Sequence, residues 1–178
     1  VAECCQAGSA IITKVEQKEK SEKPPALFDL TSLQREANRQ LGFTAQQTLD
    51  YTQALYEKKL VTYPRTDSRY LTDDMAPLVL ELVSVIQQSF QIQADVPAPV
   101  NAAQVINSKK VTDHHAIIPT GVYAQNLTDM ERRVYDLIAR RFIAVFYPDC
   151  KISTTTVMGE VDKIEFRVTG KQILEPGW

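Results

Sequence analysis

A tyrosine and two arginines lie close together in the stretch TYPRTDSRY, residues 62–70. The phenol of Tyr63 has an ordinary pKa near about 10, so it needs a nearby cation or base to act as a nucleophile. Arg65 can supply a permanent cation that holds phosphate oxygens in a planar fork. Side chains alternate along an extended segment, so Tyr63 and Arg65 would share one face. The pattern fits attack of a tyrosine on a phosphate, but it also fits, more simply, a packed strand tyrosine followed by a surface arginine.

The surroundings of Tyr63 form one of the more basic short windows of the chain, with a single carboxylate among its cations: Lys58, Lys59, Arg65, Asp67 and Arg69. The whole chain of 178 residues instead has a formal net charge of −2. This balance argues against a protein that coats nucleic acid by bulk charge, so binding of phosphate has to depend on a local patch.

Two adjacent histidines, His114 and His115, follow Asp113 in the stretch DHHAIIPT. Adjacent side chains of an extended segment point in opposite directions, and no third or fourth ligand lies at metal-binding spacing, so we predict no metal site. A histidine that donates to a phosphate oxygen is chemically reasonable, and a hydrogen-bonded structural histidine is the simpler alternative. The three cysteines, Cys4, Cys5 and Cys150, fit neither a disulfide framework nor a Cys-x-x-Cys pair, and we interpret them as reduced intracellular thiols.

Helical patterns dominate the middle of the chain. We expect helices over residues 31–41, 45–59, 73–90 and 128–147, with a shorter one over 102–108. Three of the starts carry capping boxes, namely Thr31 with Gln34, Thr44 with Gln47 and Thr128 with Glu131, and Thr72 is the expected cap of a fourth. Gly42 is expected to end the first helix, which makes the first two a helix-turn-helix unit. Such pairs are more often plain structure than readers of a DNA groove.

Other segments are expected to be extended or to break the chain. Pro64 biases Tyr63 away from helical geometry, residues 112–120 are expected to be extended or irregular, and VPAPV (96–100) breaks the chain. The pair Arg140 and Arg141 is most simply a solvated helix edge, although either could face a bound strand.

β-Prone runs occur at both ends of the chain. They cover residues 9–16, 151–158 and 163–169, the last with Ile164, Phe166 and Val168 on a half-buried face and residues 159–162 as a tight connection before it. Residues 14–25, with alternating charge and two prolines, are interpreted as a solvated connector. The expected fold class is therefore α+β, mainly α, with a helical winged-helix-like domain (26–148) inserted between β arms of a second domain (1–25 and 149–178).

Four stretches, in this order, resemble the type IA DNA topoisomerases: FDLTSLQREANRQLGFTAQQTLDYTQALYEKKL, LVTYPRTDS, HHAIIPT and RRVYDLIARRFIAVFYP. LVTYPRTDS is similar to the active-site segment of that family, in which any residue and then Arg-Thr-Asp-Ser follow the tyrosine. HHAIIPT is more similar to the topoisomerase III branch, since the topoisomerase I branch usually has His-Glu-Ala-Ile-Arg-Pro. The resemblance covers nearly the whole chain.

The resemblance implies a role for each matching residue. Tyr63 would attack single-stranded DNA to form a transient 5′-phosphotyrosine link, for strand passage and resealing without ATP. Arg65 would position the scissile phosphate, and His114 would contact the bound strand. Thr66, Asp67 and Ser68 would hold the loop and, with Arg69, contact the DNA. His115, which replaces the Glu of the other branch, has no assigned catalytic role. The β arms would belong to the arch domain of the family.

The resemblance also implies a missing part. Family members bind Mg²⁺ in an N-terminal acidic domain of the TOPRIM fold, and no comparable acidic cluster occurs in this sequence. We therefore expect a piece of a longer, monomeric, cytoplasmic and nucleoid-associated bacterial enzyme, with Mg²⁺ ligands outside this chain, no membrane segment, and no cleavage of DNA by the chain alone. The alternative is a non-catalytic winged-helix module that binds DNA or a protein.

Overall fold

The computed structural model describes residues 8–90 and 102–178, so the expected break at 96–100 lies outside the described residues. The chain divides into two compact units. One contains Val1–Lys23 and Pro148–Trp178, and the other contains Pro24–Tyr147. Within the described residues, none of the helices combines the length and the apolar character that crossing a membrane requires.

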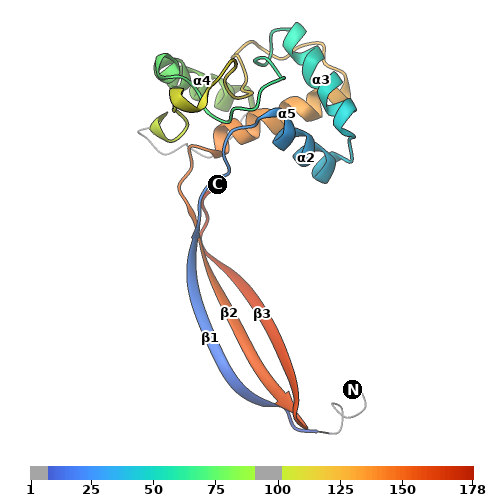
Figure 1. Ribbon diagram of the computed structural model, residues 1–178, viewed down its shortest axis with the longest axis vertical. Coiled ribbons are helices and arrows are strands. Elements are labelled where there is room, and N and C mark those ends of the chain that lie inside the picture. Colours follow the sequence, from blue (N-terminus) through green and yellow to red (C-terminus); the bar gives the residue numbers. More distant parts are fainter. Residues whose placement is uncertain (1–7, 91–101) are drawn as a thin grey trace. The chain divides into compact units, whose positions relative to one another are not determined.

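The first unit is a three-stranded antiparallel sheet. Its strands are β1 (Ile11–Glu22), β2 (Cys150–Val161) and β3 (Ile164–Glu175), in the order β1-β2-β3, and they run side by side as a long twisted ribbon (Figure 1). Asp162 and Lys163 connect β2 to β3 with φ values of 49° and 66°. Two positive φ values match the twist of a hairpin, so the turn falls here rather than over 159–162, and Gly159 lies within β2 opposite Ile12.

The charged stretch interpreted as a solvated connector is a strand over most of its length. β1 continues to Glu22 and pairs with β2 as far as Cys150. The interpretation was wrong because alternating charge indicates exposure and not conformation. A strand with water on its faces accepts lysine and glutamate as readily as a loop does, provided that a neighbouring strand satisfies its backbone.

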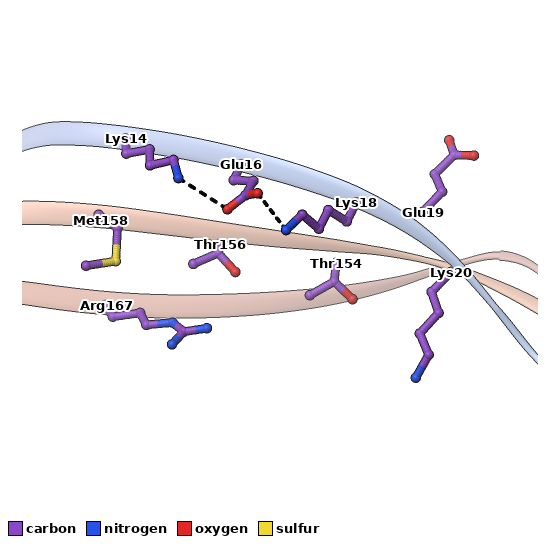
Figure 2. Close-up of a pocket in the computed structure, with 9 residues that line it drawn as sticks. All are labelled: Lys14, Glu16, Lys18, Glu19, Lys20, Thr154, Thr156, Met158 and Arg167. Atoms are coloured by element: carbon purple, nitrogen blue, oxygen red, sulfur yellow. Dashed lines mark hydrogen bonds and ion pairs between the residues drawn. The ribbon is translucent and has the colours of Figure 1, made fainter.

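The charges of β1 are balanced locally. A pocket of about 730 Å³ lies on the sheet. In it the Glu16 carboxylate lies between the ammonium groups of Lys14, at 3.4 Å, and Lys18, at 2.7 Å (Figure 2). The hydrogen bond from Lys18 is the main reason why the pKa of Glu16 lies below its ordinary value. Thr154 and Thr156 of β2 and Arg167 of β3 complete the polar lining.

The alternation predicted for β3 is present, but its apolar side chains are more exposed than expected. Phe166 is 41% exposed and Val168 is 64% exposed. The prediction of a half-buried face was therefore wrong for these two residues. Alternation with period two predicts which side chains share a face, but not whether another layer covers that face.

The second unit is helical. Its helices are α2 (Leu30–Leu41), α3 (Ala45–Glu57), α4 (Ala76–Phe90) and α5 (Asp129–Ala144), with short 3₁₀ turns at Asp73–Met75, Ala102–Gln104 and Ser108–Lys110. α5 contacts the three other helices (Figure 1). The apolar stripe predicted for α5 is buried, as the sequence suggested: Val134, Leu137, Ile138, Phe142 and Val145. Period 3.6 thus identified the central packing face.

Most of the predicted helix ends are confirmed. Thr44 with Gln47 and Thr128 with Glu131 form capping boxes, and Gly42 ends α2 with φ 72°. The cap of α2 was predicted wrongly, since Asp29 caps it together with Ser32. Phe28, which precedes the cap Asp29, forms a β-bridge with Ile117, and this extended pairing sets the start of the helix at Leu30.

Three other helix predictions need correction. Thr72 precedes a single 3₁₀ turn and makes no side-chain cap hydrogen bond, so the expected helix over 73–90 becomes a turn followed by α4. The expected helix over 102–108 is two separate turns, and α5 ends at Ala144 rather than at residue 147.

Replacing Gly42 with alanine should lower the free energy of unfolding by about 1 kcal/mol. An added Cβ meets no atom within 4 Å, so the cost comes from the left-handed backbone at φ 72° alone. Chemical denaturation measures the change, and Gly42→Asn should cost less because asparagine tolerates this conformation. An unchanged stability of Gly42→Ala would show that the turn relaxes.

Candidate active site

The segment that carries Tyr63 leaves α3 and runs in extended form across the helical unit. Lys59, with φ 60°, ends the turn after α3, and the Leu60 N–H donates to the Leu55 carbonyl at 2.9 Å. Thr62 and Ile118 then pair through their backbones at 3.0 Å, and Val61 bridges Pro119 in antiparallel fashion. The extended geometry predicted from Pro64 is confirmed, and its partner is the stretch HHAIIPT.

Burial alternates strictly after Tyr63. Pro64, Thr66 and Ser68 are buried, whereas Arg65 and Asp67 are exposed, as is residue 69. Tyr63 itself is half-buried. Period two therefore places Arg65 on the same outward side as Tyr63, as the spacing suggested.

The ring of Tyr63 contacts two other rings. The centroid of the His114 ring lies 4.3 Å away at an angle of 43°. The ring of Tyr56, from the last turn of α3, lies 5.4 Å away and nearly perpendicular, at 79°. The fold therefore brings together two of the residues singled out in the sequence, Tyr63 and His114, although they lie far apart along the chain.

Two buried hydroxyl groups attach the Tyr63 segment to the histidine segment. Thr66 Oγ1 donates to the His114 carbonyl at 2.7 Å and accepts from the Ser68 N–H at 3.1 Å. Ser68 Oγ donates to the Lys110 carbonyl at 2.9 Å. The inward side chains of the motif are thus structural supports, and the position of the His114 backbone depends on Thr66.

Two of the four basic residues of the window are paired inside the protein. Lys58 Nζ lies 2.8 Å from both carboxylate oxygens of the buried Glu131, and this hydrogen bond holds the pKa of Glu131 below its ordinary value. Arg69 Nε donates to Asp29 Oδ2 at 2.6 Å. Within the described residues, the side chains of Lys59 and Arg65 form no ion pair or hydrogen bond. These two cations remain available to a bound anion.

Of the two adjacent arginines on α5, one is exposed and the other is largely buried. Arg140 is exposed, as a solvated edge requires. The side chain of Arg141 is only 17% exposed, lies 4.0 Å from the ring centre of Phe28 and donates to the Ala26 carbonyl at 3.1 Å. Its burial lowers the pKa of Arg141. The solvated-edge interpretation was therefore wrong for Arg141, which packs against the core.

The other histidine has a different environment. Nδ1 of His115 lies 2.8 Å from the Ala116 carbonyl oxygen, so the two histidines do not act as a pair. Among residues 8–90 and 102–178, no group of three or more histidine, cysteine, aspartate or glutamate side chains could hold a metal ion. The described residues therefore do not fit a Mg²⁺ site, and the expectation that such ligands lie elsewhere stays a prediction.

A groove of about 530 Å³ opens beside Tyr63. It is lined by Tyr56, Glu57, Lys59, Val61, Thr62, Tyr63, His115 and Thr120. Tyr56 was not predicted from the sequence as a site residue, although one signal was present: an aromatic residue in the last turn of a helix that leads directly to Tyr63.

The sequence matches the DNA topoisomerase family over residues 1–178, and the chain belongs to this family, in its bacterial type IA class. Two curated relatives are named DNA topoisomerase 3. The one from Bacillus subtilis (strain 168) is 40% identical over 97% of this chain and 25% of that protein, and the one from Bacillus licheniformis is 40% identical over 100% of this chain and 25% of that protein. The chain spans about a quarter of the length of these relatives.

A solved structure leads to the same family. Full-length topoisomerase I from Thermotoga maritima matches with a TM-score of 0.68 and 25% identity, over 97% of this chain and 29% of that one. The resemblance to type IA topoisomerases, and to their topoisomerase III branch, is thereby confirmed.

Replacing Thr66 with valine should lower the free energy of unfolding by about 1–3 kcal/mol. The change keeps the shape of the side chain but leaves the Ser68 N–H without its acceptor and the His114 carbonyl without its donor. Thr112→Val is the matched control, because the Thr112 hydroxyl is exposed and lies 3.4 Å from Asp67. Equal stabilities of the two variants in urea would contradict the structural role of Thr66.

Asp29 should make the stability depend on pH. Burial alone would raise the pKa of Asp29, but hydrogen bonds from Ser32 and Arg69 outweigh it, so the folded-state pKa is lowered. The ionised carboxylate therefore stabilises the fold fully above the unfolded-state pKa of about 3.9, and this contribution is lost as the pH falls through the folded-state value.

Comparison with Asp29→Asn tests this dependence, since asparagine also caps helices but does not ionise. The wild type should be more stable by about 1 kcal/mol at pH 7, and the difference should shrink below about pH 4. A difference that stays constant down to pH 3 would contradict the assignment.

Proposed function

We propose that this chain is the tyrosine-bearing part of a type IA DNA topoisomerase and that Tyr63 is its nucleophile. The observation that carries the proposal is the arrangement around the phenol. The ring of Tyr63 contacts that of His114. Arg65, two residues further on, is exposed and has no counter-ion among the described residues. Structural tyrosines do not need such a neighbour, whereas attack on a phosphodiester does.

The proposed step is a transesterification. Tyr63 Oη attacks the phosphorus of single-stranded DNA, the bond from phosphorus to the 3′ oxygen breaks, and the DNA 5′-phosphate becomes esterified to the tyrosine. The phenol loses a proton and the departing 3′ oxygen gains one. Because one phosphate ester replaces another, resealing is the reverse reaction and requires no ATP.

Arg65 and His114 would act on the phosphate. Negative charge grows on the non-bridging oxygens as the phenol approaches, and a guanidinium whose charge is not already neutralised stabilises it most. His114, in contact with the Tyr63 ring, would donate to the strand beside the cleaved bond. Asp67 and Arg69 would contact the strand from the outward face. Arg69 would do so while its Nε still donates to Asp29.

The proposal also assigns the helical unit to a domain of the family. The helical unit would be the winged-helix-like domain of the family, inserted between strands of the arch. Mg²⁺ and the groups that transfer the protons would come from a TOPRIM domain outside this chain. We therefore expect the isolated chain to be inactive.

Tyr63→Phe in the intact topoisomerase should abolish the covalent adduct, because the substitution removes only the attacking oxygen. The measurement is a denaturing gel of the enzyme mixed with labelled single-stranded DNA. The matched control is Tyr123→Phe, at a tyrosine that is 69% exposed and lies away from the groove, and it should form the adduct normally. An undiminished adduct with Tyr63→Phe would rule out the assignment and favour a non-catalytic binding module.

Arg65→Ala should slow cleavage by about 100-fold or more, as loss of a donor to a developing charge does. The free energy of unfolding should change by less than about 0.5 kcal/mol, because the side chain is exposed and has no partner to lose among the described residues. Single-turnover cleavage and urea denaturation measure the two effects. Unchanged cleavage would contradict a role on the phosphate, and a large loss of stability would indicate a structural role.

A further inference from the structure

The groove beside Tyr63 has features that the cleavage step does not use. Its walls come from three places: the end of α3, the segment 61–63, and the segment 115–120. At about 530 Å³ it falls within the usual range of sites for small molecules. Tyr63 forms part of the lining, so an occupant of the groove would lie next to the reacting phenol.

An exposed aromatic ring forms one wall. Tyr56 is 39% exposed, although its neighbour in the same turn, Leu55, is fully buried. The ring meets that of Tyr63 at 79°, so the planes of the two rings are nearly perpendicular. An aromatic face open to water beside a groove provides a surface for stacking, and nucleic-acid bases of every kind present a flat π face to such a ring.

A cation, Lys59, also lines the groove. The side chain of Lys59 has no ion pair or hydrogen bond within the part of the chain described, in contrast to Lys58, which is held by Glu131. The turn itself does not require a lysine, because the backbone of Lys59 has φ 60°, where glycine would be favoured. The ammonium group is therefore available to a phosphate within reach of the groove.

Three other polar side chains of the groove already take part in hydrogen bonds within the protein. Thr62 Oγ1 donates to the Ala116 carbonyl at 3.0 Å, Thr120 Oγ1 donates to the Lys59 carbonyl at 2.6 Å, and Glu57 accepts from Gln53 at 3.1 Å. These three side chains therefore have less capacity left to recognise the edge of a base. A ligand would instead be held by its flat face and its charge.

We propose that this groove binds one nucleotide of the single strand next to the cleaved bond, with its base stacked on Tyr56 and its phosphate paired with Lys59. This inference rests on the proposed function, and it adds a subsite that recognises a nucleotide without selecting its base. The nucleotide would fix the strand relative to Tyr63, so the site positions the scissile phosphate.

Binding measurements test the stacking independently of cleavage. Full-length enzyme carrying Tyr63→Phe is titrated with single-stranded oligonucleotides in which one abasic site is moved along the strand. We expect one position at which the abasic site weakens binding by roughly tenfold, the usual size of one stacking contact. Adding Tyr56→Ala should remove this penalty, Tyr56→Phe should preserve it, and the matched control Tyr123→Ala should preserve it as well.

Two results would overturn the stacking contact. In one, the penalty profile is the same with and without Tyr56→Ala. In the other, Tyr56→Ala weakens the binding of every oligonucleotide equally, including the one that lacks the critical base, as a purely structural role predicts. Neither result depends on whether Tyr63 is the nucleophile, so the two proposals can fail separately.

The salt dependence of binding tests Lys59. Lys59→Gly removes the ammonium and relieves the left-handed backbone, so the fold should tolerate it. The slope of log K against log salt concentration should become shallower by about 0.7. Lys163→Gly, at another lysine with positive φ, in the β2–β3 turn, is the matched control and should leave the slope unchanged. An unchanged slope with Lys59→Gly would overturn the phosphate contact.

Discussion

The arrangement around Tyr63 depends on one constraint: an extended segment crosses a helical unit in which it has few regular strand partners. Its buried backbone groups must still be paired. Short hydroxyl side chains supply much of this pairing, since Thr62 and Thr66 both donate to carbonyl groups of the histidine segment and Ser68 donates to the Lys110 carbonyl. Because Thr66 and Ser68 must point inward, the residues that alternate with them must point outward.

The same constraint determines which charges are available. Lys58 and Arg69 flank the segment and are held by Glu131 and Asp29, each of which also belongs to the capping box of a helix. These two carboxylates thus neutralise Lys58 and Arg69, whereas Arg65 and Lys59 have no counter-ion among the described residues and are available to an anion. A chain with a net charge of −2 can in this way present a small cationic site.

Sequence patterns predicted the local parts of this arrangement. Two of the three predicted capping boxes, the role of Gly42 and the bias that Pro64 imposes on Tyr63 depend on neighbours a few residues away, and the structure agrees with them. The errors involve distant partners. Asp29 replaced Thr31 as a cap because the bridge of Phe28 to Ile117 sets the start of α2. The contact between the His114 and Tyr63 rings and the groove beside Tyr56 are products of tertiary packing. The charged β1 was missed because exposure was taken for lack of structure.

The central claim is that the oxygen of Tyr63 becomes covalently attached to DNA. The most direct measurement is mass spectrometry of the trapped full-length enzyme after nuclease and trypsin digestion. Trypsin releases residues 60–65 as one peptide, with Tyr63 as its sole tyrosine, whereas Tyr51 and Tyr56 fall together in residues 40–58. The account predicts a 5′-phosphonucleotide on the peptide 60–65. The same modification on the peptide that contains Tyr56, with an unmodified Tyr63, would contradict it.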